Sequence, residues 1–562
     1  MQSILDNLIL TFAGLPQFAL IIAALLAWPI SFLILRRYRA SVNKTMTQQS
    51  EGVFSDLQDD SFQNNSFIKD EGFQSMSSLS TDRLFSIIIK RPWSITYLNL
   101  IAGSAYSLIL TLFCFWSGKF EFYSIRFAFL FLSYLWPVVF ALNMVIPGKT
   151  KFKFSLLSFY FLIYLSICFI AAQTNLAFTI KQGLLLWELS NLLPTLLVLI
   201  FFKSKVRAIG SLVYTLIAVA SSGSTTVLNY VLKSNSMMLT TINIGSAFHL
   251  GFYSSFIALF ILLMVFFGFA GWYILIVIKN RYKAKKINDQ KIMLDSIWIL
   301  FAIYYSIDFA AQGYVWLIGG FLSFFLCKLI VTTGHKILNK KYQLKESSNL
   351  LFLRVFSLGK RSEQFFNLVS KHWRFAGSIQ LISGPDLATT NLEPHEFTDY
   401  ITGKLSRRFI GNPKDLEIRL SEMDNKPDRD GQYRVNDFFC YQNTWQMVLQ
   451  KLVNKSNVVL MDLRGFSTAN KGCEYEIREL FNIIPADRIV FIYDQTSDQV
   501  FMNQILKQAW DEMKPASLNK QSDFDSISMF KLTDLSYKNI RALLKLLCDA
   551  ATDDTSLKSQ LI

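Results

Sequence analysis

The sequence predicts an α-helical polytopic membrane domain of about nine spans, followed by a C-terminal α/β domain with a doubly wound parallel sheet. First, apolar residues gather in blocks of roughly 18 to 25, the length that crosses a bilayer core as a helix. Second, Lys and Arg cluster in alternate connections between these blocks. Third, short apolar runs alternate with amphipathic segments from residue 350 onward.

Composition supports this division of the chain. Of its 562 residues 52% are hydrophobic, and the formal net charge is +15. Residues 1–333 hold 25 Lys and Arg against 13 Asp and Glu, whereas residues 334–562 hold 31 against 28, so the excess is 12 in the first part and 3 in the second. The basic excess belongs to the membrane loops, and we expect no nucleic-acid partner.

Nine segments are long and apolar enough to be spans. They are Phe18–Leu35, Ile95–Trp116, Phe127–Ile146, Phe154–Ala172, Leu184–Phe202, Gly210–Leu232, Tyr253–Ile278, Ser296–Gln312 and Tyr314–Thr333. Asp6 precedes the first span and no basic residue does, which favours a retained helix over a cleaved signal peptide.

The basic clusters orient the spans. They lie at Arg36, Arg37 and Arg39, at Lys90 and Arg91, at Lys149, Lys151 and Lys153, at Lys203, Lys205 and Arg207, at Lys279, Arg281, Lys283, Lys285 and Lys286, and at Lys336, Lys340 and Lys341. All fall on one side of the bilayer if the N-terminus is outside and the C-terminus inside. We expect an integral protein of a bacterial inner membrane with a cytoplasmic C-terminal domain.

Six units follow from these patterns. We expect a first transmembrane helix in residues 1–36, a bundle of about eight further helices in 93–333 and a cytoplasmic α/β domain in 350–552. The remaining units are a largely disordered cytoplasmic loop (37–92), a linker (334–349) and a disordered tail (553–562).

Two acidic residues fall within predicted spans, where a charge is costly. Glu188 lies in the fifth span and Asp308 in the eighth. Both line a polar cavity or proton path, or both lie near the outer interface and reach water, and the sequence leaves these alternatives open.

Four apolar runs predict the buried strands of the sheet: Leu350–Phe356, Ser378–Ile382, Asn457–Leu463 and Arg488–Asp494. The helices between them are expected near Ser362–Lys371, Glu396–Arg408, Thr444–Val453, Gly472–Phe481 and Tyr537–Asp549. In such sheets ligands bind at the carboxyl ends of the strands.

The sequence lacks the motifs of several common binding and active sites. It contains no phosphate-binding GxxxxGK[ST], no GxGxxG after a strand, no GxSxG and no HExxH. The six cysteines form no CxxC pair and the histidines are dispersed, so we expect neither a metal site nor a bound cofactor.

One segment resembles a known family. Trp445–Glu476 reads WQMVLQKLVNKSNVVLMDLRGFSTANKGCEYE. It is similar to the part of TIR domains in which an amphipathic helix, a buried strand and a serine-containing loop lead to a W-C-x-x-E signature. The run LRVFSLGKRSEQF also looks like a TIR first strand and its loop. The chain as a whole resembles bacterial multi-span membrane proteins with a cytoplasmic domain of this kind.

The resemblance implies a candidate site. In NAD-cleaving TIR domains the signature Glu is catalytic, and Glu476 matches it, with Cys473 at the Cys position and Gly472 where the family has Trp. The resemblance also implies Ser467 as ligand-binding and NAD as a substrate. The alternative for Glu476 is an exposed first-turn acid favoured by the helix dipole, and for Cys473 it is a packed thiol.

Two arginines at strand ends, Arg354 and Arg464, extend the candidate site. Both leave the same edge of the sheet, where guanidinium groups bind phosphates well. Their alternative is surface ion pairing.

Three functions are compatible with the sequence. The first is a membrane-anchored signalling or effector protein whose TIR-like domain binds, and in one version cleaves, a nucleotide such as NAD. The second is a scaffold without enzymatic activity that forms homo-oligomers through the α/β domain. The third is a transporter or channel with a regulatory cytoplasmic domain.

Overall fold

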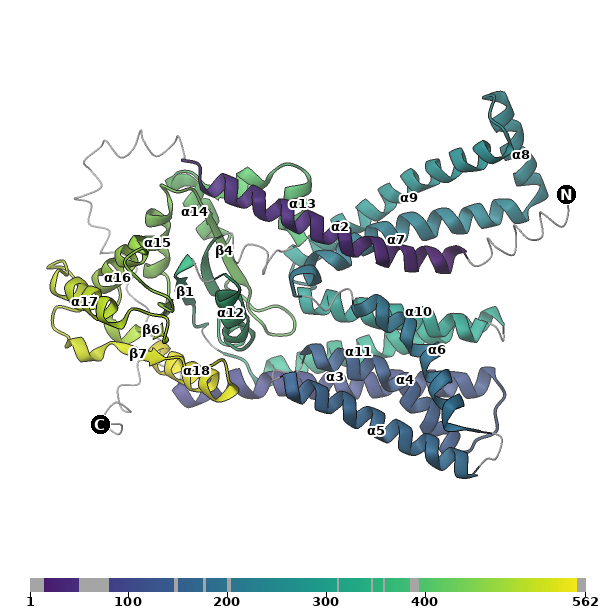
Figure 1. Cartoon of the computed structure of the whole chain (residues 1–562), viewed down its shortest axis with the longest axis horizontal. Helices are drawn as coiled ribbons and strands as arrows, with labels where there is room; N and C mark the ends of the chain where they lie inside the picture. Colours follow the sequence, from purple (N-terminus) through teal and green to yellow (C-terminus); the bar gives the residue numbers. More distant parts are fainter. Residues whose placement is uncertain are drawn as a thin grey trace.

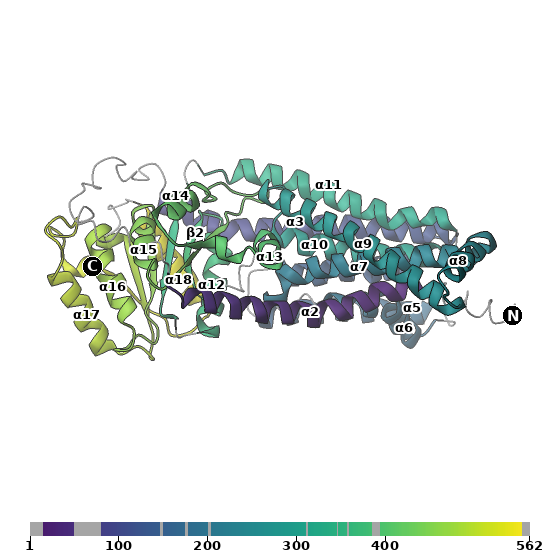
Figure 2. The same ribbon diagram turned by 90° about the horizontal axis from the view of Figure 1, so that it is seen from above.

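The computed structural model describes residues 15–49, 80–145, 150–174, 178–199, 204–310, 313–344, 347–356, 359–384 and 394–552. A bundle of long helices forms one end of the molecule and an α/β domain forms the other (Figure 1). The two ends are continuous, because several bundle helices run on into the α/β domain (Figure 2).

The bundle contains ten α-helices and one short 3-10 helix within the described residues. They are α2 (Leu15–Met46), α3 (Thr81–Ser117), α4 (Ser124–Val145), α5 (Thr150–Thr174), α6 (Ile180–Leu199), α7 (Ser204–Lys233), α8 (Asn235–Ala247), α9 (Phe252–Lys283), α10 (Asp289–Ala310), η4 (Tyr314–Leu317) and α11 (Ile318–Lys341). Helices α2, α7, α8 and α9 form one group in Figure 1, and the other helices form a second group beside it.

Seven helices of the described chain are long and apolar enough to cross a membrane: α2, α3, α4, α5, α7, α9 and α11. The other two expected spans fall on α6 and α10, which are not among these seven. The chain therefore has the apolar helices of a membrane protein, and the count of nine spans stays a prediction.

Helices α2 and α3 extend beyond their apolar parts. Helix α2 takes in residues 37–46 and α3 takes in residues 81–92, both of which the sequence analysis assigned to a loop. Residues 50–79 of that loop lie outside the described part of the chain. Helix α11 likewise continues through residues 334–341 of the expected linker. These extensions reach the α/β domain, so helices rather than a loose tether join the two ends.

The α/β domain is built on one sheet in which every strand pair is parallel, as predicted. The strand order is β3-β4-β2-β1-β5-β6-β7. The strands are β1 (Leu350–Arg354), β2 (Ile379–Ser383), β3 (Phe409–Ile410), β4 (Val435–Cys440), β5 (Val458–Asp462), β6 (Ile489–Tyr493) and β7 (Ser528–Lys531). The part β2-β1-β5-β6-β7 has the order of flavodoxin-like sheets, and β3 and β4 extend it at one edge.

The four predicted strands are β1, β2, β5 and β6, and they lie at the centre of the sheet. Their residues are buried, apart from the half-buried Tyr493, because helices cover both faces, and this is why they read as continuous apolar runs. The edge strand β7 was not predicted; it is partly exposed and reads as a polar segment. The polar stretch 383–443 also yielded only one expected helix, although β3 and β4 lie within it.

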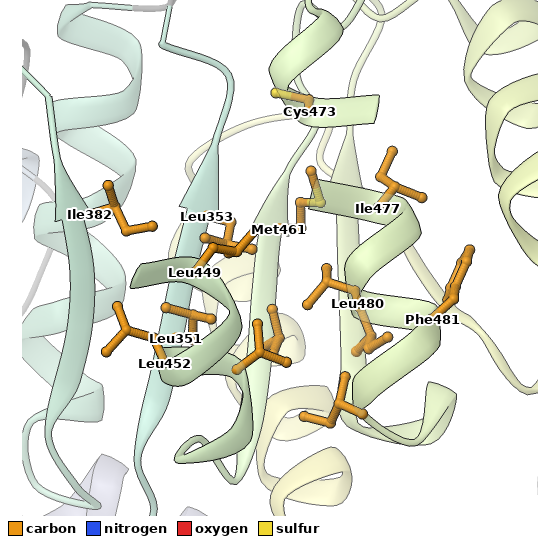
Figure 3. Close-up of a cluster of buried hydrophobic side chains, with 14 of the residues drawn as sticks. Leu351, Leu353, Ile382, Leu449, Leu452, Met461, Cys473, Ile477, Leu480 and Phe481 are labelled. Carbon is orange, nitrogen blue, oxygen red and sulfur yellow. The ribbon is translucent and has the colours of Figure 1, made fainter. Parts of the chain in front are cut away.

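Seven α-helices complete the domain within the described residues: α12 (Lys360–Trp373), α13 (Pro394–Ile401), α14 (Pro413–Ser421), α15 (Trp445–Asn454), α16 (Lys471–Ile483), α17 (Gln499–Asp511) and α18 (Tyr537–Ala551). A 3-10 turn, η6 (Leu405–Arg408), lies between α13 and α14. Two further 3-10 turns are η7 (Ala486–Arg488) and η8 (Phe524–Ser526). Helices α15, α16 and α17 pack on one face of the sheet. Figure 3 shows apolar side chains of α15 and α16 directed toward β1 and β5.

The opposite face of the sheet is covered by α12, α18 and the start of α3. Leu84 and Ile88 of α3 are fully buried in the same core as Phe352 of β1 and Phe365 of α12. Residues of a membrane helix therefore form part of the hydrophobic core of the α/β domain.

Candidate functional site

The carboxyl ends of β1, β5 and β6 meet at one edge of the sheet, beside the first turn of α12. Arg354 is the last residue of β1, and it is paired in register with Asp462, the last residue of β5. Reversal of strand order between β1 and β5 makes this edge the expected ligand crevice of such a sheet.

Arg464 is held by the strand that it follows. Its Nη2 lies 2.7 Å from Oδ2 of Asp462, and its Nε donates to Oδ1 of the same carboxylate at 2.8 Å. The guanidinium also lies 4.5 Å from the ring centroid of Phe365 in α12. Both charged residues are buried. Arg464 therefore forms an ion pair, as the alternative interpretation of the sequence expected. The pair is buried, however, and not on the surface.

A second ion pair lies at the same edge, and the sequence analysis missed it. Arg361, in the first turn of α12, pairs with Asp494, which directly follows β6. Asp494 also accepts hydrogen bonds from the backbone N–H and the hydroxyl of Thr496, at 2.9 and 2.6 Å. The Arg361 side chain is 48% exposed, so this cation remains open to solvent. The signal for it was a basic residue at the start of a helix that follows a strand.

Arg354 is buried at the centre of the edge. Its Nη1 donates to the carbonyl oxygen of Ile382 at 3.2 Å, and its guanidinium lies 4.8 Å from the ring centroid of Phe356. Phe356 is 46% exposed, so its ring covers the arginine from the solvent side.

Glu476 lies on the buried face of α16, close enough to Arg354 for the charge of the guanidinium to act on its carboxyl. The residue is only 4% exposed, which contradicts the alternative of an exposed first-turn acid. Burial raises the pKa of its carboxyl to about 8, and the charge of Arg354 partly opposes this rise. Among the described residues, Oε2 of Glu476 has no hydrogen-bond partner. The carboxyl is therefore enclosed, and it is mostly protonated near pH 7.

The other residues implied by the resemblance lie around Glu476. The Cys473 thiol is buried one turn earlier, 4.0 Å from the carbonyl oxygen of Arg354, and burial raises its pKa well above the usual range. Cys473 is therefore a packed thiol. Ser467 donates to Oδ1 of Asn470 at 3.2 Å within the loop before α16. A side chain added at Gly472 would meet open space, so the position of the family Trp faces outward.

The candidate residues of the membrane part are not brought to this edge. Glu188 is exposed on α6. Asp308 falls in α10, but its side chain is outside the part that the structure describes. Within the described residues, no group of three or more His, Cys, Asp or Glu side chains is arranged to hold a metal ion.

A second collection of charged residues lies where the α/β domain meets the bundle. It includes Asp437 of β4, which accepts a hydrogen bond from the hydroxyl of Ser383 at 2.9 Å. Burial raises the pKa of Asp437 to about 7, and Ser383, Arg354 and Arg408 oppose the rise. The sequence analysis missed Asp437 because β4 lies within the polar stretch that yielded no strand.

No family model, no curated protein and no solved structure matches this chain.

Proposed function

We propose that this chain is a membrane signalling protein whose cytoplasmic TIR-like domain binds a nucleotide such as NAD at the carboxyl edge of β1 and β5. The observation that carries the proposal is the contact between α3 and α12. The first turn of α12 contributes Arg361 to the edge, whereas its last turns pack against Ile88 of α3. One short helix thus joins a membrane helix to the proposed binding site.

The edge has the chemistry of a phosphate site. The start of a helix favours anions because its first backbone N–H groups have no partner within the helix. Lys360 and Arg361 add two cations to that start, and Arg361 is half exposed. A phosphate group that displaced Asp494 from Arg361 would form a bidentate pair with the guanidinium.

Binding at this edge would act on the membrane part through packing. Phe365 lies beneath Arg464 at the edge, and it shares a core with Leu84 and Ile88. Packed cores change between discrete arrangements rather than deforming continuously, so movement of α12 shifts α3. This coupling favours the signalling function over a soluble enzyme that is only tethered to the membrane.

The topology belongs to the same proposal: nine spans, an outside N-terminus and a cytoplasmic α/β domain in a bacterial inner membrane. Support comes from the basic residues that end α2, α9 and α11, because the α/β domain lies at these helix ends (Figure 2).

The test uses the full chain in lipid nanodiscs, because α3 supplies part of the core of the α/β domain. NAD is titrated against the wild type, Arg361→Gln and the matched control Arg478→Gln. Arg478 also forms a half-exposed ion pair, with Glu512, but on the outer side of α16. We expect Arg361→Gln to weaken NAD binding at least tenfold, about 1.4 kcal/mol, and Arg478→Gln to leave it unchanged. Equal binding by all three proteins contradicts the proposed edge.

A second candidate function is cleavage of the bound nucleotide, and the perturbed carboxyl of Glu476 favours it. Breaking the glycosidic bond develops positive charge on the ribose, which a nearby carboxylate stabilises. Glu476 is neutral below about pH 8, so we expect nicotinamide release by the full chain to increase as pH rises to that value. Glu476→Gln should lower the rate roughly a hundredfold or more. If the full chain neither binds NAD nor releases nicotinamide, both candidate functions fail. The remaining function is then a scaffold that self-associates through the α/β domain.

A further inference from the structure

A large cavity lies at the junction of the membrane bundle and the α/β domain, away from the edge of β1 and β5. Its volume is about 910 Å³, at the upper end of the roughly 300–1,000 Å³ of small-molecule sites. The end of α9, helices α13 and α14, the turn η6 and strand β4 all contribute to its walls.

The lining of this junction cavity is basic. Eight Lys and Arg side chains face five Asp and Glu side chains, an excess of three positive charges. The excess becomes four when Asp437 is protonated, and the pKa of that carboxyl is about 7.

The acidic residues of the wall are largely engaged. Glu396 lies 2.7 Å from Nη1 of Arg408, and Oε2 of Glu422 lies 3.1 Å from Nη1 of Arg419. Asp424 pairs with Lys285, across the boundary between α9 and the α/β domain. These pairs hold the wall of the cavity together.

Four of the eight cations of the lining lie outside the ion pairs of the wall: Lys283, Lys404, Arg407 and Lys426. In the described part of the chain, no carboxylate lies within ion-pair distance of any of the four. All four are exposed, so a solvent-borne ligand can reach them. Like charges converge here without compensation, which costs free energy that an anion would recover.

His395 belongs to the lining of the cavity and lies among several of its positive charges. Burial, together with the charges of Arg408, Lys283, Arg434 and Arg419, lowers the pKa of this imidazole to about 2. Its Nε2 accepts a hydrogen bond from Nη2 of Arg408 at 2.6 Å, so the neutral ring also orients that guanidinium.

We propose that the junction cavity binds an anion carrying two or more phosphate groups. Three surplus positive charges match such an anion better than a single carboxylate, and flexible Lys and Arg side chains around an open cavity suit phosphate oxygens. The cavity begins at Lys283, at the end of a membrane helix. The same chemistry is therefore available from a soluble polyphosphate and from anionic phospholipid headgroups.

Two arms of one experiment separate these sources, and both use the full chain. In the first arm, inorganic tripolyphosphate is titrated against protein in phosphatidylcholine nanodiscs. In the second arm, native mass spectrometry measures phosphatidylglycerol retained by protein released from mixed-lipid nanodiscs. The cavity variant is Lys404→Gln/Arg407→Gln. The matched control is Lys414→Gln/Lys455→Gln, which removes two exposed charges outside the cavity.

A soluble ligand is supported if tripolyphosphate binds wild type and control at least tenfold more tightly than the cavity variant. A headgroup ligand is supported if tripolyphosphate does not bind, yet retained phosphatidylglycerol is lost only in the cavity variant. The proposal is overturned if neither probe binds, or if cavity variant and control bind equally. None of these variants alters Arg361, so failure here is distinct from failure of NAD binding at the sheet edge.

Discussion

Nδ1 of His372, in the α/β domain, lies 3.4 Å from the backbone carbonyl oxygen of Ile88, in a helix that continues into the membrane bundle. Burial lowers the pKa of His372 to about 4, so the ring is neutral near pH 7 and donates its Nδ1 proton to that carbonyl. The pair marks the place where a helix of the bundle becomes part of the core of the α/β domain.

Shortening the side chain of Ile88 should loosen this core. Ile88 is fully buried, and Ile→Ala changes at such positions typically cost about 2–5 kcal/mol. Hydrogen exchange measured on the full chain should show faster exchange of β1 and α12 in Ile88→Ala. Ile101→Ala is the control, because Ile101 lies on the same helix and is 62% exposed. Similar exchange in the two variants would show that α3 only rests against the domain.

The stability of the α/β domain should fall as pH rises from about 4.5 to about 8, because of Glu476. Its pKa is raised from 4.5 to about 8 in the folded chain, so the folded state keeps a proton that the unfolded state releases in this window. The contribution of this group is fully present below about pH 4.5 and is lost toward pH 8, at up to about 1.4 kcal/mol per pH unit.

Denaturant unfolding of the full chain across this pH range tests the assignment. Glu476→Gln is neutral at every pH and should flatten the profile relative to wild type. Identical profiles for wild type and Glu476→Gln would mean that the carboxyl reaches water and has an ordinary pKa.

Arg434 should be critical for docking the α/β domain onto α9. Its Nη2 donates to the carbonyl oxygen of Tyr282 at 2.7 Å and lies 2.9 Å from Oδ1 of the buried Asp428. Arg434→Met leaves Asp428 unpaired, and we expect a loss of about 3 kcal/mol, the low end for breaking a buried ion pair. We expect the low end because burial already raises the pKa of Asp428 to about 6. Without Arg434 the Asp428 carboxyl can take up a proton, which limits the free-energy cost of burying it unpaired.

The double variant Arg434→Met/Asp428→Asn should recover part of this loss, since no buried charge then remains unpaired. Denaturant unfolding of the three proteins measures it. Arg419→Met, which breaks a pair with the exposed Glu422, is the control. An equal loss in Arg419→Met and Arg434→Met would contradict the docking role.

Membrane topology can be tested by labelling single cysteines introduced into a cysteine-free chain. Lys285→Cys should react only with reagent on the cytoplasmic side, because Lys285 contacts Asp424 of the α/β domain. Lys181→Cys and Lys233→Cys should react from the outside, since each belongs to a connection at the opposite end of the bundle. Labelling of position 233 from the same side as position 285 would rule out the nine-span arrangement.

The sequence alone determined the elements whose side chains lie in one environment along their whole length. The central strands β1 and β5 are apolar throughout because both faces of the sheet are covered, and the apolar membrane helices are equally uniform. The position of Glu476 was also implicit, because Cys473, Ile477 and Leu480 place it on the buried stripe of α16.

Only the tertiary structure decided how the two ends of the molecule combine. The start of α3 reads as the edge of a polar loop, yet Leu84 and Ile88 complete a core whose strands lie more than 250 residues later. The junction cavity gathers Lys283, Arg407 and Asp437 from three separate segments. Neither feature has a local pattern in the sequence, because local periodicity records which face of an element is buried but not which distant segment buries it.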